Sequence, residues 1–400
     1  MFLKGKRILI GITGGIASYK VYELIRLLIK EGAEVKTVLT PSALNFVSPT
    51  VLSTLSGKEP YWDWNYRRPL IHIDLAKWCD AFLIAPATVN TISKLACGIA
   101  DNLLTATWFA CHKPKLIAPA ANSVMLSDSI IRENLKRLKK AGVEIIPSDE
   151  GLLACGDVGE GKLANVNLIR DYLVKALTPQ RWKGKTVLIT LGSTKEYLDP
   201  VRFISNSSSG KMGLALAKAI FYQGGEPILV AGDIKVDIPH WFRKFTVDTS
   251  EELLKLCLEL FPSVDAVFMN AAVTDYRFKE TFRGKLKKKE QTLKVELDPT
   301  PDILKELGKR KDNQLLVGFA VETENLIENA LQKLKRKNLD AIVVNPAEVM
   351  GKDRYEGILL TKDGRKEEIK TSTKEEGAFL ITKKVAQIFM EDPQWERKYP

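Results

Sequence analysis

The sequence has few cysteines, and none of them are paired at short spacing. Its 400 residues include five cysteines, an odd number, and no CxxC motif. A disulfide scaffold uses an even number of cysteines and a zinc site uses closely spaced pairs, so neither is expected here. The composition therefore favours a protein of a reducing compartment.

Long apolar runs are also missing. No stretch approaches the roughly 18 apolar residues of a membrane-spanning helix. The N-terminus runs from a short apolar segment into a glycine turn and shows no signal-cleavage pattern. We expect a soluble, cytoplasmic protein that does not contact a membrane.

Concentrated basic charge is absent despite a net charge of +11. The 60 lysines and arginines are dispersed among 49 acidic residues. The densest basic run, KLKKK at 285–289, has no aromatic residues on which bases could stack. Small anionic substrates explain this charge as well as nucleic acid does, and we expect no nucleic-acid partner.

Apolar strands alternate with helical patterns along both halves of the chain. In the first half, segments 6–14, 34–40, 80–88, 115–121 and 143–149 read as strands, with a helix expected over 16–32. Strands that are almost continuously aliphatic indicate a parallel sheet with helices on both faces. A proline-containing, charged stretch at 177–185 reads as a linker.

A second α/β series follows this linker. Its strands are expected at 186–192, 227–233, 265–273, 314–320 and 340–346, with a hairpin turning at Asp363 and Gly364 and a last helix at 374–390. Residues 284–298 alternate charged and apolar side chains. The fold class is therefore α/β with two domains, at 1–180 and 185–400. Ligands of such sheets bind beyond the carboxyl ends of the strands.

Polar residues follow several strands of the first half. GITGGIAS at 11–18 places a glycine turn between strand and helix, which suits a phosphate but also suits tight packing alone. Thr88, Asn90 and Asn122 could bond a flat heterocycle or serve only as helix caps. His72 could act as a general base or be structural.

The tetrapeptide LACG occurs twice, around Cys97 and Cys155. Cys97 shares helical spacing with Ile92, Leu95, Ile99 and Leu103, so we expect a packed, inert helix position. Cys155 lies among Gly151, Gly156, Gly159 and Gly161, which predict a mobile loop. A loop that closes over a substrate is a common place for a proton donor.

The serine-rich stretch SNSSSGKMG at 205–213 is not a nucleotide-binding P-loop. Ser205 stands where the first glycine is required, and Met212 replaces the magnesium-binding hydroxyl. Serines and Gly210 before the next helix still predict an anion site. Lys333 and Lys337 lie one helical turn apart and could bind one phosphate chain. KLKKK could equally be a solvated strand edge.

Motifs across nearly the whole chain closely resemble a known family. GGIASYK, HIDLAKW, APATVNTISK, ADNLL, PAAN and ACGDVGEGKLA resemble phosphopantothenoylcysteine decarboxylases. LGSTKEYLDPVRFISNSSSGKMG, AAVTDYR, KLKKK, GFAVET and KLKRKNLDAIVVN look like the phosphopantothenate:cysteine ligase fused to that enzyme in bacteria. The order of the motifs is also that of the family.

For the first domain, the resemblance implies a flavoprotein-type sheet that binds FMN. The matching cofactor positions are Gly14, Gly15, Ser18, Thr40, Ser42, Ala87 and Thr88. The implied reaction is decarboxylation made possible by transient oxidation of the substrate thiol, for which FMN supplies the redox chemistry. His72 would be the base, Asn122 would hold the departing carboxylate, and Cys155 would donate a proton.

For the second domain, the resemblance implies a Rossmann-like ligase that uses CTP, Mg²⁺, 4'-phosphopantothenate and cysteine. Asn206 would stabilise an acyl-cytidylate, and Lys285 would neutralise triphosphate charge. The matching CTP positions are Asn270, Ala271, Asp275, Lys285, Thr300, Pro301, Asp302, Ile303, Phe319, Lys333 and Lys337. The resemblance leaves the residues that would bind the metal open.

The family also implies a homo-oligomer, with trimers formed through the flavin domain and grouped into dodecamers. Two alternatives stay open. The first domain could decarboxylate another thiol, such as a peptide's C-terminal cysteine, or prenylate flavin. The chain could also be a regulatory protein that binds flavin and nucleotide without turnover.

Overall fold

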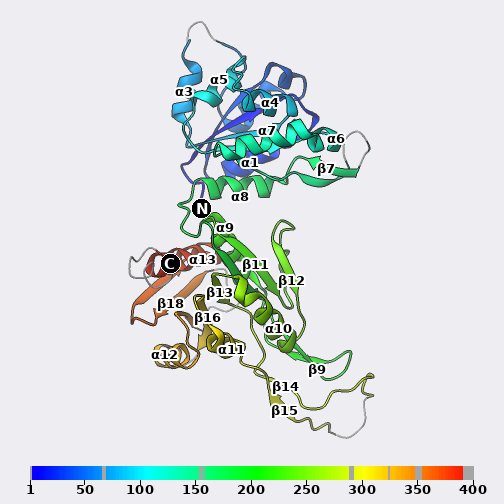
Figure 1. The fold of residues 1–400 in the computed structure, drawn as a ribbon, viewed down its shortest axis with the longest axis vertical. Coiled ribbons are helices and arrows are strands. Elements are labelled where there is room, and N and C mark those ends of the chain that lie inside the picture. The colour runs from blue at the N-terminus through cyan, green and yellow to red at the C-terminus, as the bar shows by residue number, and fades with distance from the viewer. Residues whose placement is uncertain are drawn as a thin grey trace. The chain divides into compact units, whose positions relative to one another are not determined.

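The structure is a computed structural model that describes residues 2–64, 69–152, 156, 158–287, 292–322, 325–346 and 354–390. The chain divides into two compact units, Met1–Thr178 and Pro179–Pro400. Each contains its own sheet, and the two are coloured blue to green and green to red in Figure 1. They are described separately below.

The first unit is built on a five-stranded parallel sheet with the order β2-β1-β3-β4-β5. All five strands fall in segments that the sequence predicts as strands. Their interior residues are aliphatic and buried on both faces, as expected for a parallel sheet between helices. The strands are β1 (Arg7–Ile12), β2 (Glu34–Leu39), β3 (Ala81–Ala87), β4 (Lys115–Pro119) and β5 (Glu144–Ile145).

Helices cover both faces of this sheet. One face, with Leu9, Phe82 and Ile117, packs against α3 (Ile71–Trp78), α4 (Val89–Ala96), α5 (Leu103–Ala110) and α7 (Ser129–Lys140). On the other side α1 (Val21–Lys30) packs against α8 (Val166–Ala176), which contacts β3. The remaining helical segments are η1 (Ile16–Lys20), η2 (Pro41–Asn45), α2 (Pro49–Ser56) and α6 (Ser123–Ser127).

The glycine-containing segments 149–152 and 158–162, on either side of Cys155 in the sequence, are paired strands where the sequence predicts a loop. Strands β6 (Asp149–Leu152) and β7 (Val158–Lys162) pair antiparallel. The glycines exclude a helix, as expected. They do not prevent strand pairing, because Gly151 and Gly159 face each other across the hairpin.

The second unit contains an eight-stranded sheet with the order β12-β11-β8-β13-β16-β17-β18-β19. The strands from β12 to β17 pair in parallel, and the β18–β19 hairpin adds an antiparallel edge. The hairpin turns at Asp363 and Gly364, as predicted. Its strands are β8 (Thr186–Leu191), β11 (Glu226–Ala231), β12 (Arg243–Thr246), β13 (Ala266–Met269), β16 (Leu315–Glu322), β17 (Ala341–Pro346), β18 (Tyr355–Thr361) and β19 (Lys366–Thr371).

This sheet is also covered on both faces. One apolar cluster joins it to α9 (Lys211–Tyr222) and α13 (Lys374–Phe389). A second cluster on the opposite face joins it to α10 (Ser250–Leu260), η3 (Phe261–Ser263), α11 (Ile303–Arg310) and α12 (Leu326–Arg336). Two short antiparallel pairs lie outside the sheet: β9 (Lys195–Tyr197) with β10 (Phe203–Ser205), and β14 (Tyr276–Phe278) with β15 (Leu297–Pro299).

The predicted linker at 177–185 is not a free connection. Trp182 is fully buried in the apolar cluster beneath α9 and α13, and its indole N–H donates to the Thr382 carbonyl at 3.1 Å. Its ring also meets Phe268 of β13 edge to face. The proline and charges suggested a linker, but the buried indole makes this stretch part of the second unit's core.

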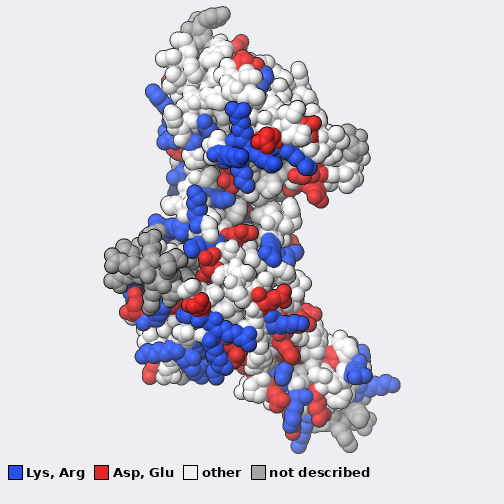
Figure 2. Space-filling view, viewed as in Figure 1, with Lys and Arg blue, Asp and Glu red and all other residues white. Residues whose placement is uncertain are grey.

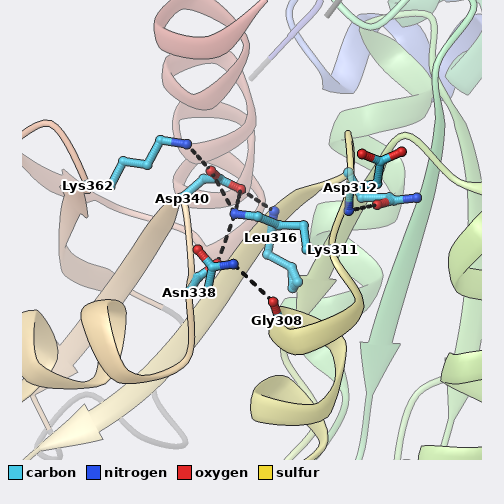
Figure 3. A network of polar contacts seen from close by, with 8 residues as sticks. Gly308, Lys311, Asp312, Leu316, Asn338, Asp340 and Lys362 are labelled. Carbon is cyan, nitrogen blue, oxygen red and sulfur yellow. Dashed lines mark hydrogen bonds and ion pairs between the residues drawn. The ribbon is translucent and has the colours of Figure 1, made fainter. Parts of the chain in front are cut away.

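A buried carboxylate organises the amino ends of β16 and β17 (Figure 3). Asp340 is fully buried and accepts from the Leu316 backbone N–H at 2.8 Å. Lys311 Nζ lies 3.1 Å from it and Lys362 Nζ lies 2.5 Å away, so two cations compensate its charge. This network stands at the sheet edge away from the strands' carboxyl ends, which indicates a structural role.

Surface charge is mixed rather than gathered into one basic stripe. On the face drawn in Figure 2, acidic and basic side chains are interleaved over both units. Within the described residues, no helix combines the length and apolar character needed to cross a membrane.

Candidate functional site

A cavity of about 530 Å³ lies within the first unit at the carboxyl ends of β1, β3 and β4. The loops after these strands contribute Gly15, Thr88 and Asn122 to its wall. The β6–β7 hairpin closes another side with Leu152 and Gly161. The cavity is therefore where ligands of open parallel sheets bind.

The glycine turn after β1 is fixed by close contacts. A Cβ on Gly14 would lie 2.5 Å from the Ser42 hydroxyl oxygen, and one on Gly15 would lie 3.3 Å from Thr88 Cγ2. Thr13 Oγ1 donates to the Pro86 carbonyl at 2.7 Å and accepts from the Thr88 N–H at 3.1 Å. A side chain at position 14 would therefore collide with the Ser42 loop, and one at position 15 would press against Thr88.

The predicted cofactor residues gather around this turn. Gly15 and Thr88 line the cavity. Ser42 abuts Gly14, and its hydroxyl lies 3.2 Å from that of Thr40. The other two are buried: Ser18 donates to the Thr13 carbonyl at 2.8 Å, and Ala87 ends β3. Their roles toward FMN remain predictions.

The predicted catalytic residues of this unit are only partly brought together. Asn122 lines the cavity, and its Oδ1 caps α6 by accepting from the Val124 N–H at 2.8 Å. Cys155 lies outside the described residues, although both strands flanking it are described. His72 is in the first turn of α3, where its ring meets Trp64 edge to face, and it is not among the residues lining the cavity.

Cys97 is placed differently from its prediction. Helix α4 ends at Ala96, and Cys97 is an exposed C-cap residue. The helix predicted through Leu103 is wrong because Gly98 adopts φ +76°, a left-handed conformation that ends the helix. Cys97 is therefore a surface thiol at the end of a helix, not a packed position within one.

Two cations in the cavity wall were missed by the sequence analysis. Lys20 and Lys162 both line the cavity, and Lys20 Nζ lies 3.4 Å from the Leu163 carbonyl oxygen. Burial, followed by the charge of Lys162, lowers the pKa of Lys20. The signal was available, because Lys20 ends the quoted motif GGIASYK and Lys162 lies in ACGDVGEGKLA.

In the second unit, hydrogen bonds connect several predicted site residues in series. Asn206, directly after β10, donates through Nδ2 to the Val273 carbonyl at 2.9 Å. Thr300 donates through Oγ1 to the next carbonyl, that of Thr274, at 2.5 Å, and through its backbone N–H to the Asp275 carbonyl at 3.0 Å. The loop after β13 is thereby held between Asn206 and the segment before α11.

The series continues to α12. Asp302 is the N-cap of α11, where its Oδ1 accepts from the Lys305 N–H at 3.2 Å. The same oxygen lies 2.8 Å from Nζ of Lys337, the C-cap of α12. Pro301 and Ile303 lie on either side of Asp302, and Lys333 is one turn before Lys337. The predicted lysine pair therefore stands beside the predicted 300–303 segment.

The remaining predicted positions are spread over several elements of the second unit. Asn270 and Ala271 follow β13, where the Ala271 N–H donates to Thr190 Oγ1 at 3.0 Å, and Phe319 is half-buried on β16. Lys285 is exposed on the segment between β14 and β15. Lys288 and Lys289 of KLKKK lie outside the described residues. Asp275 is exposed directly before β14.

At the predicted anion site before α9, two of the backbone N–H groups that could bind an anion already donate to serine hydroxyls. Gly210 is the N-cap with φ +75°, and its N–H donates to Ser208 Oγ at 3.4 Å. The Lys211 N–H donates to Ser209 Oγ, also at 3.4 Å. These long bonds leave the loop as a candidate nucleotide contact beside Asn206.

The two units match two family models. Residues 2–178 match the family described as Flavoprotein, and residues 182–389 match the DNA/pantothenate metabolism flavoprotein C-terminal domain. A solved structure of the C-terminal domain of coenzyme A biosynthesis bifunctional protein CoaBC is 38% identical, covering 53% of this chain and 100% of that chain with a TM-score of 0.47.

Curated relatives match almost end to end. The coenzyme A biosynthesis bifunctional protein CoaBC of Bacillus subtilis (strain 168) is 39% identical over 397 residues, 96% of this chain and 98% of the relative. The protein of the same name from Haemophilus influenzae is 40% identical over 374 residues, 92% of this chain and 94% of the relative. With both units matched in order and at this coverage, the chain belongs to the family of coenzyme A biosynthesis bifunctional proteins.

Proposed function

We propose that the chain makes 4'-phosphopantetheine in two steps. The second unit ligates cysteine to 4'-phosphopantothenate with CTP, and the first unit decarboxylates the phosphopantothenoylcysteine formed. The main observation behind this proposal is the match to bifunctional relatives over almost the whole chain. It is supported by a cavity at the carboxyl ends of the first unit's parallel strands, and by a connected polar site around the loop after β13 in the second unit.

The first unit's residues fit FMN. The cavity of about 530 Å³ falls in the range of small-molecule sites and lies against Gly15 and Thr88. Lys20 and Lys162 add positive charge suited to anionic groups. Bound there, FMN would supply reversible two-electron chemistry at the thiol-bearing carbon.

The chain's own residues would orient the substrate and move its protons. Asn122 presents its amide at the cavity wall, where Nδ2 can donate to the carboxylate that leaves as carbon dioxide. Cys155, between strands whose residues line the cavity, would protonate the enethiol as it is reduced. His72 would serve as base near the thiol. It does not line the cavity, so we propose that it acts only once the site is completed by substrate or by a second copy of the chain.

In the ligase unit, the carboxylate of phosphopantothenate attacks the α-phosphorus of CTP and displaces pyrophosphate. Asn206 would stabilise the acyl-cytidylate, which the cysteine amine then attacks to release CMP. Lys337, oriented by Asp302, and Lys285 would balance the triphosphate charge. Mg²⁺ bound to the triphosphate would neutralise further charge on the transferring phosphoryl group.

The test is incubation of the full chain with phosphopantothenate, cysteine, CTP and Mg²⁺. Pyrophosphate and carbon dioxide are expected in equal amounts. Lys285→Gln should stop pyrophosphate release but leave decarboxylation of added phosphopantothenoylcysteine intact. Lys366→Gln, a change at an exposed lysine of edge strand β19, is its matched control.

The products separate the alternatives. Pyrophosphate without carbon dioxide would contradict the decarboxylase assignment and favour another thiol substrate for the first unit. Neither product, despite binding of flavin and CTP, would favour a regulatory protein. Homo-oligomers and a cytoplasmic location remain part of the proposal.

A further inference from the structure

The turn between β9 and β10 contains a buried carboxylate that shapes its own backbone. Asp199 is 2% exposed. Its Oδ1 accepts hydrogen bonds from the backbone N–H groups of Val201 and Arg202, both at 2.8 Å. Aspartate commonly bonds the backbone two residues ahead in this way, and the bonds fix the turn.

The other carboxylate oxygen reaches a segment more than eighty positions away. Asp199 Oδ2 accepts from the Leu286 backbone N–H at 3.0 Å. Arg202 Nη1 lies 2.5 Å from this oxygen and also donates to the Leu286 carbonyl at 2.9 Å. Both backbone polar groups of Leu286 are therefore held by the Asp199–Arg202 pair, which we call the Leu286 clamp.

The Leu286 clamp is stabilised by the negative charge of the Asp199 carboxylate and the positive charge of the Arg202 guanidinium. Burial of the carboxyl group opposes ionisation, but the N–H donors of Leu286, Val201 and Arg202 and the guanidinium outweigh it and lower the pKa of Asp199 to about 2. The carboxylate is thus ionised at any physiological pH. Hydrogen bonds to a charged acceptor are about twice as strong as neutral ones.

The clamp joins two residues with proposed catalytic roles. Lys285 immediately precedes Leu286 and is exposed, on a segment with no regular secondary structure. Asn206 follows the last residue of β10, about 13 Å along the strand from Arg202 at roughly 3.3 Å per residue. One short hairpin therefore carries Asn206 at one end and fixes the backbone beside Lys285 at the other.

We propose that Asp199 is a positioning residue for the ligase reaction. It holds the backbone beside Lys285 so that the ammonium group is presented to the nucleotide triphosphate in a fixed relation to Asn206. Ordering this segment before the nucleotide arrives reduces the entropy lost when the transition state forms. The inference rests on the proposed ligase function and adds a residue to it.

The test uses Asp199→Asn in the full chain. Asparagine keeps the shape and one acceptor oxygen but replaces the other with an NH₂ group, which cannot accept from the Leu286 N–H. Hydrogen exchange of the peptide containing Leu286 should become faster. Pyrophosphate release should lose about tenfold or more in kcat/KM for CTP, the effect of one charge-assisted hydrogen bond. Decarboxylation of added phosphopantothenoylcysteine should be unchanged.

Glu296→Gln is the matched control. It removes the exposed Lys279–Glu296 ion pair from the same segment and does not change the clamp. Hydrogen exchange at Leu286 and kcat/KM for CTP should therefore stay at their wild-type values. If Asp199→Asn speeds exchange at Leu286 but leaves the CTP kinetics unchanged, the clamp is only structural and the proposal is wrong. If the wild-type chain itself releases no pyrophosphate, the ligase function has failed and the clamp has no reaction to serve.

A second variant keeps the proposal testable if Asp199→Asn unfolds, shown by faster exchange in β8 and β13. Arg202→Lys retains the carboxylate but removes the guanidinium bond to the Leu286 carbonyl. It should raise KM for CTP while exchange in the core strands stays slow. Unchanged CTP kinetics in this variant would also overturn the proposal.

Discussion

At the scale of single residues, identical neighbours do not give two cysteines the same environment. Cys97 is exposed at the end of α4, next to a left-handed glycine. Cys155 lies outside the described residues, between strands β6 and β7, whose residues Leu152 and Gly161 line the cavity of the first unit. The sequence separated the two thiols by their surrounding glycines, but it misjudged Cys97 because helical spacing alone does not reveal where a helix ends.

The two cysteines make a matched pair of variants. Cys155→Ser should let the enethiol product of decarboxylation accumulate, because a hydroxyl is a much weaker acid than a thiol and cannot complete the reduction. Cys97→Ser should turn over at the wild-type rate. Mass spectrometry of products from added phosphopantothenoylcysteine measures both. Equal loss in the two variants would contradict the assignment of Cys155.

The Asp199 carboxylate gives a pH dependence with a defined sign. Its pKa in the folded protein, about 2, lies below the unfolded value of about 3.9. The stabilisation is therefore complete above about pH 4 and is lost as the pH falls towards 2. The free energy of unfolding of wild type should exceed that of Asp199→Asn by a constant amount from pH 5 to 8. Curves that diverge within that range would contradict the low pKa.

At the scale of elements, aliphatic runs in the sequence predicted the strands of the large sheets but not the short two-stranded hairpins. Every strand of the first unit's sheet falls in a predicted segment, because a strand buried on both faces must be continuously apolar. The hairpins β6–β7 and β9–β10 have no such run, and glycine or side-chain contacts stabilise them instead. The contact of Asp199 with Leu286 was missed because the two residues are far apart in the sequence.

The predicted sites follow the same rule. Thr88 and Asn122 lie directly after strands of the parallel sheet and were singled out because that edge of the sheet is known in advance. Asn206 follows β10, outside the eight-stranded sheet, and was identified by the family resemblance alone. Lys20 and Lys162 were missed because they reach the cavity from a 3-10 helix and a hairpin. Contacts of that kind depend on packing, which periodicity does not encode.

The β6–β7 hairpin offers a prediction at this scale. Gly161 has φ +137°, and a Cβ there would lie 2.2 Å from the Ala121 carbonyl oxygen. Gly161→Ala should push the hairpin away from the Asn122 loop. Decarboxylation should fall about a hundredfold, as expected when a catalytic group moves by about 1 Å. Steady-state release of carbon dioxide from added phosphopantothenoylcysteine measures it.

Gly151→Ala is the control in the same hairpin. Gly151 also has a left-handed φ, +148°, but the nearest atom to its Cβ position is Lys162 Cδ at an ordinary 3.8 Å. Both variants carry backbone strain, and only Gly161→Ala carries the collision. The loss in Gly151→Ala should therefore be much smaller. Equal losses would mean that strain, not the contact with Ala121, governs the hairpin.

At the scale of the whole molecule, the chain is two units with separate cores. The division falls after Thr178, and the stretch that follows packs into the second unit through Trp182. Each unit also has its own candidate site at the carboxyl ends of its own strands. A loss of stability in one core should therefore leave the reaction of the other unit intact.

Trp182→Ala tests this division. Removing a fully buried tryptophan costs about 3–5 kcal/mol, and the lost Nε1 bond leaves the Thr382 carbonyl without that donor. The second unit's unfolding temperature should fall by roughly 10 °C, while decarboxylation persists. Trp108→Ala, in the first unit's core, is the reciprocal control and should lower only the flavin-linked transition. Calorimetry with flavin fluorescence separates the two transitions. If Trp182→Ala lowered both transitions equally, residues 179–185 would have to stabilise both cores, and the division after Thr178 would be wrong.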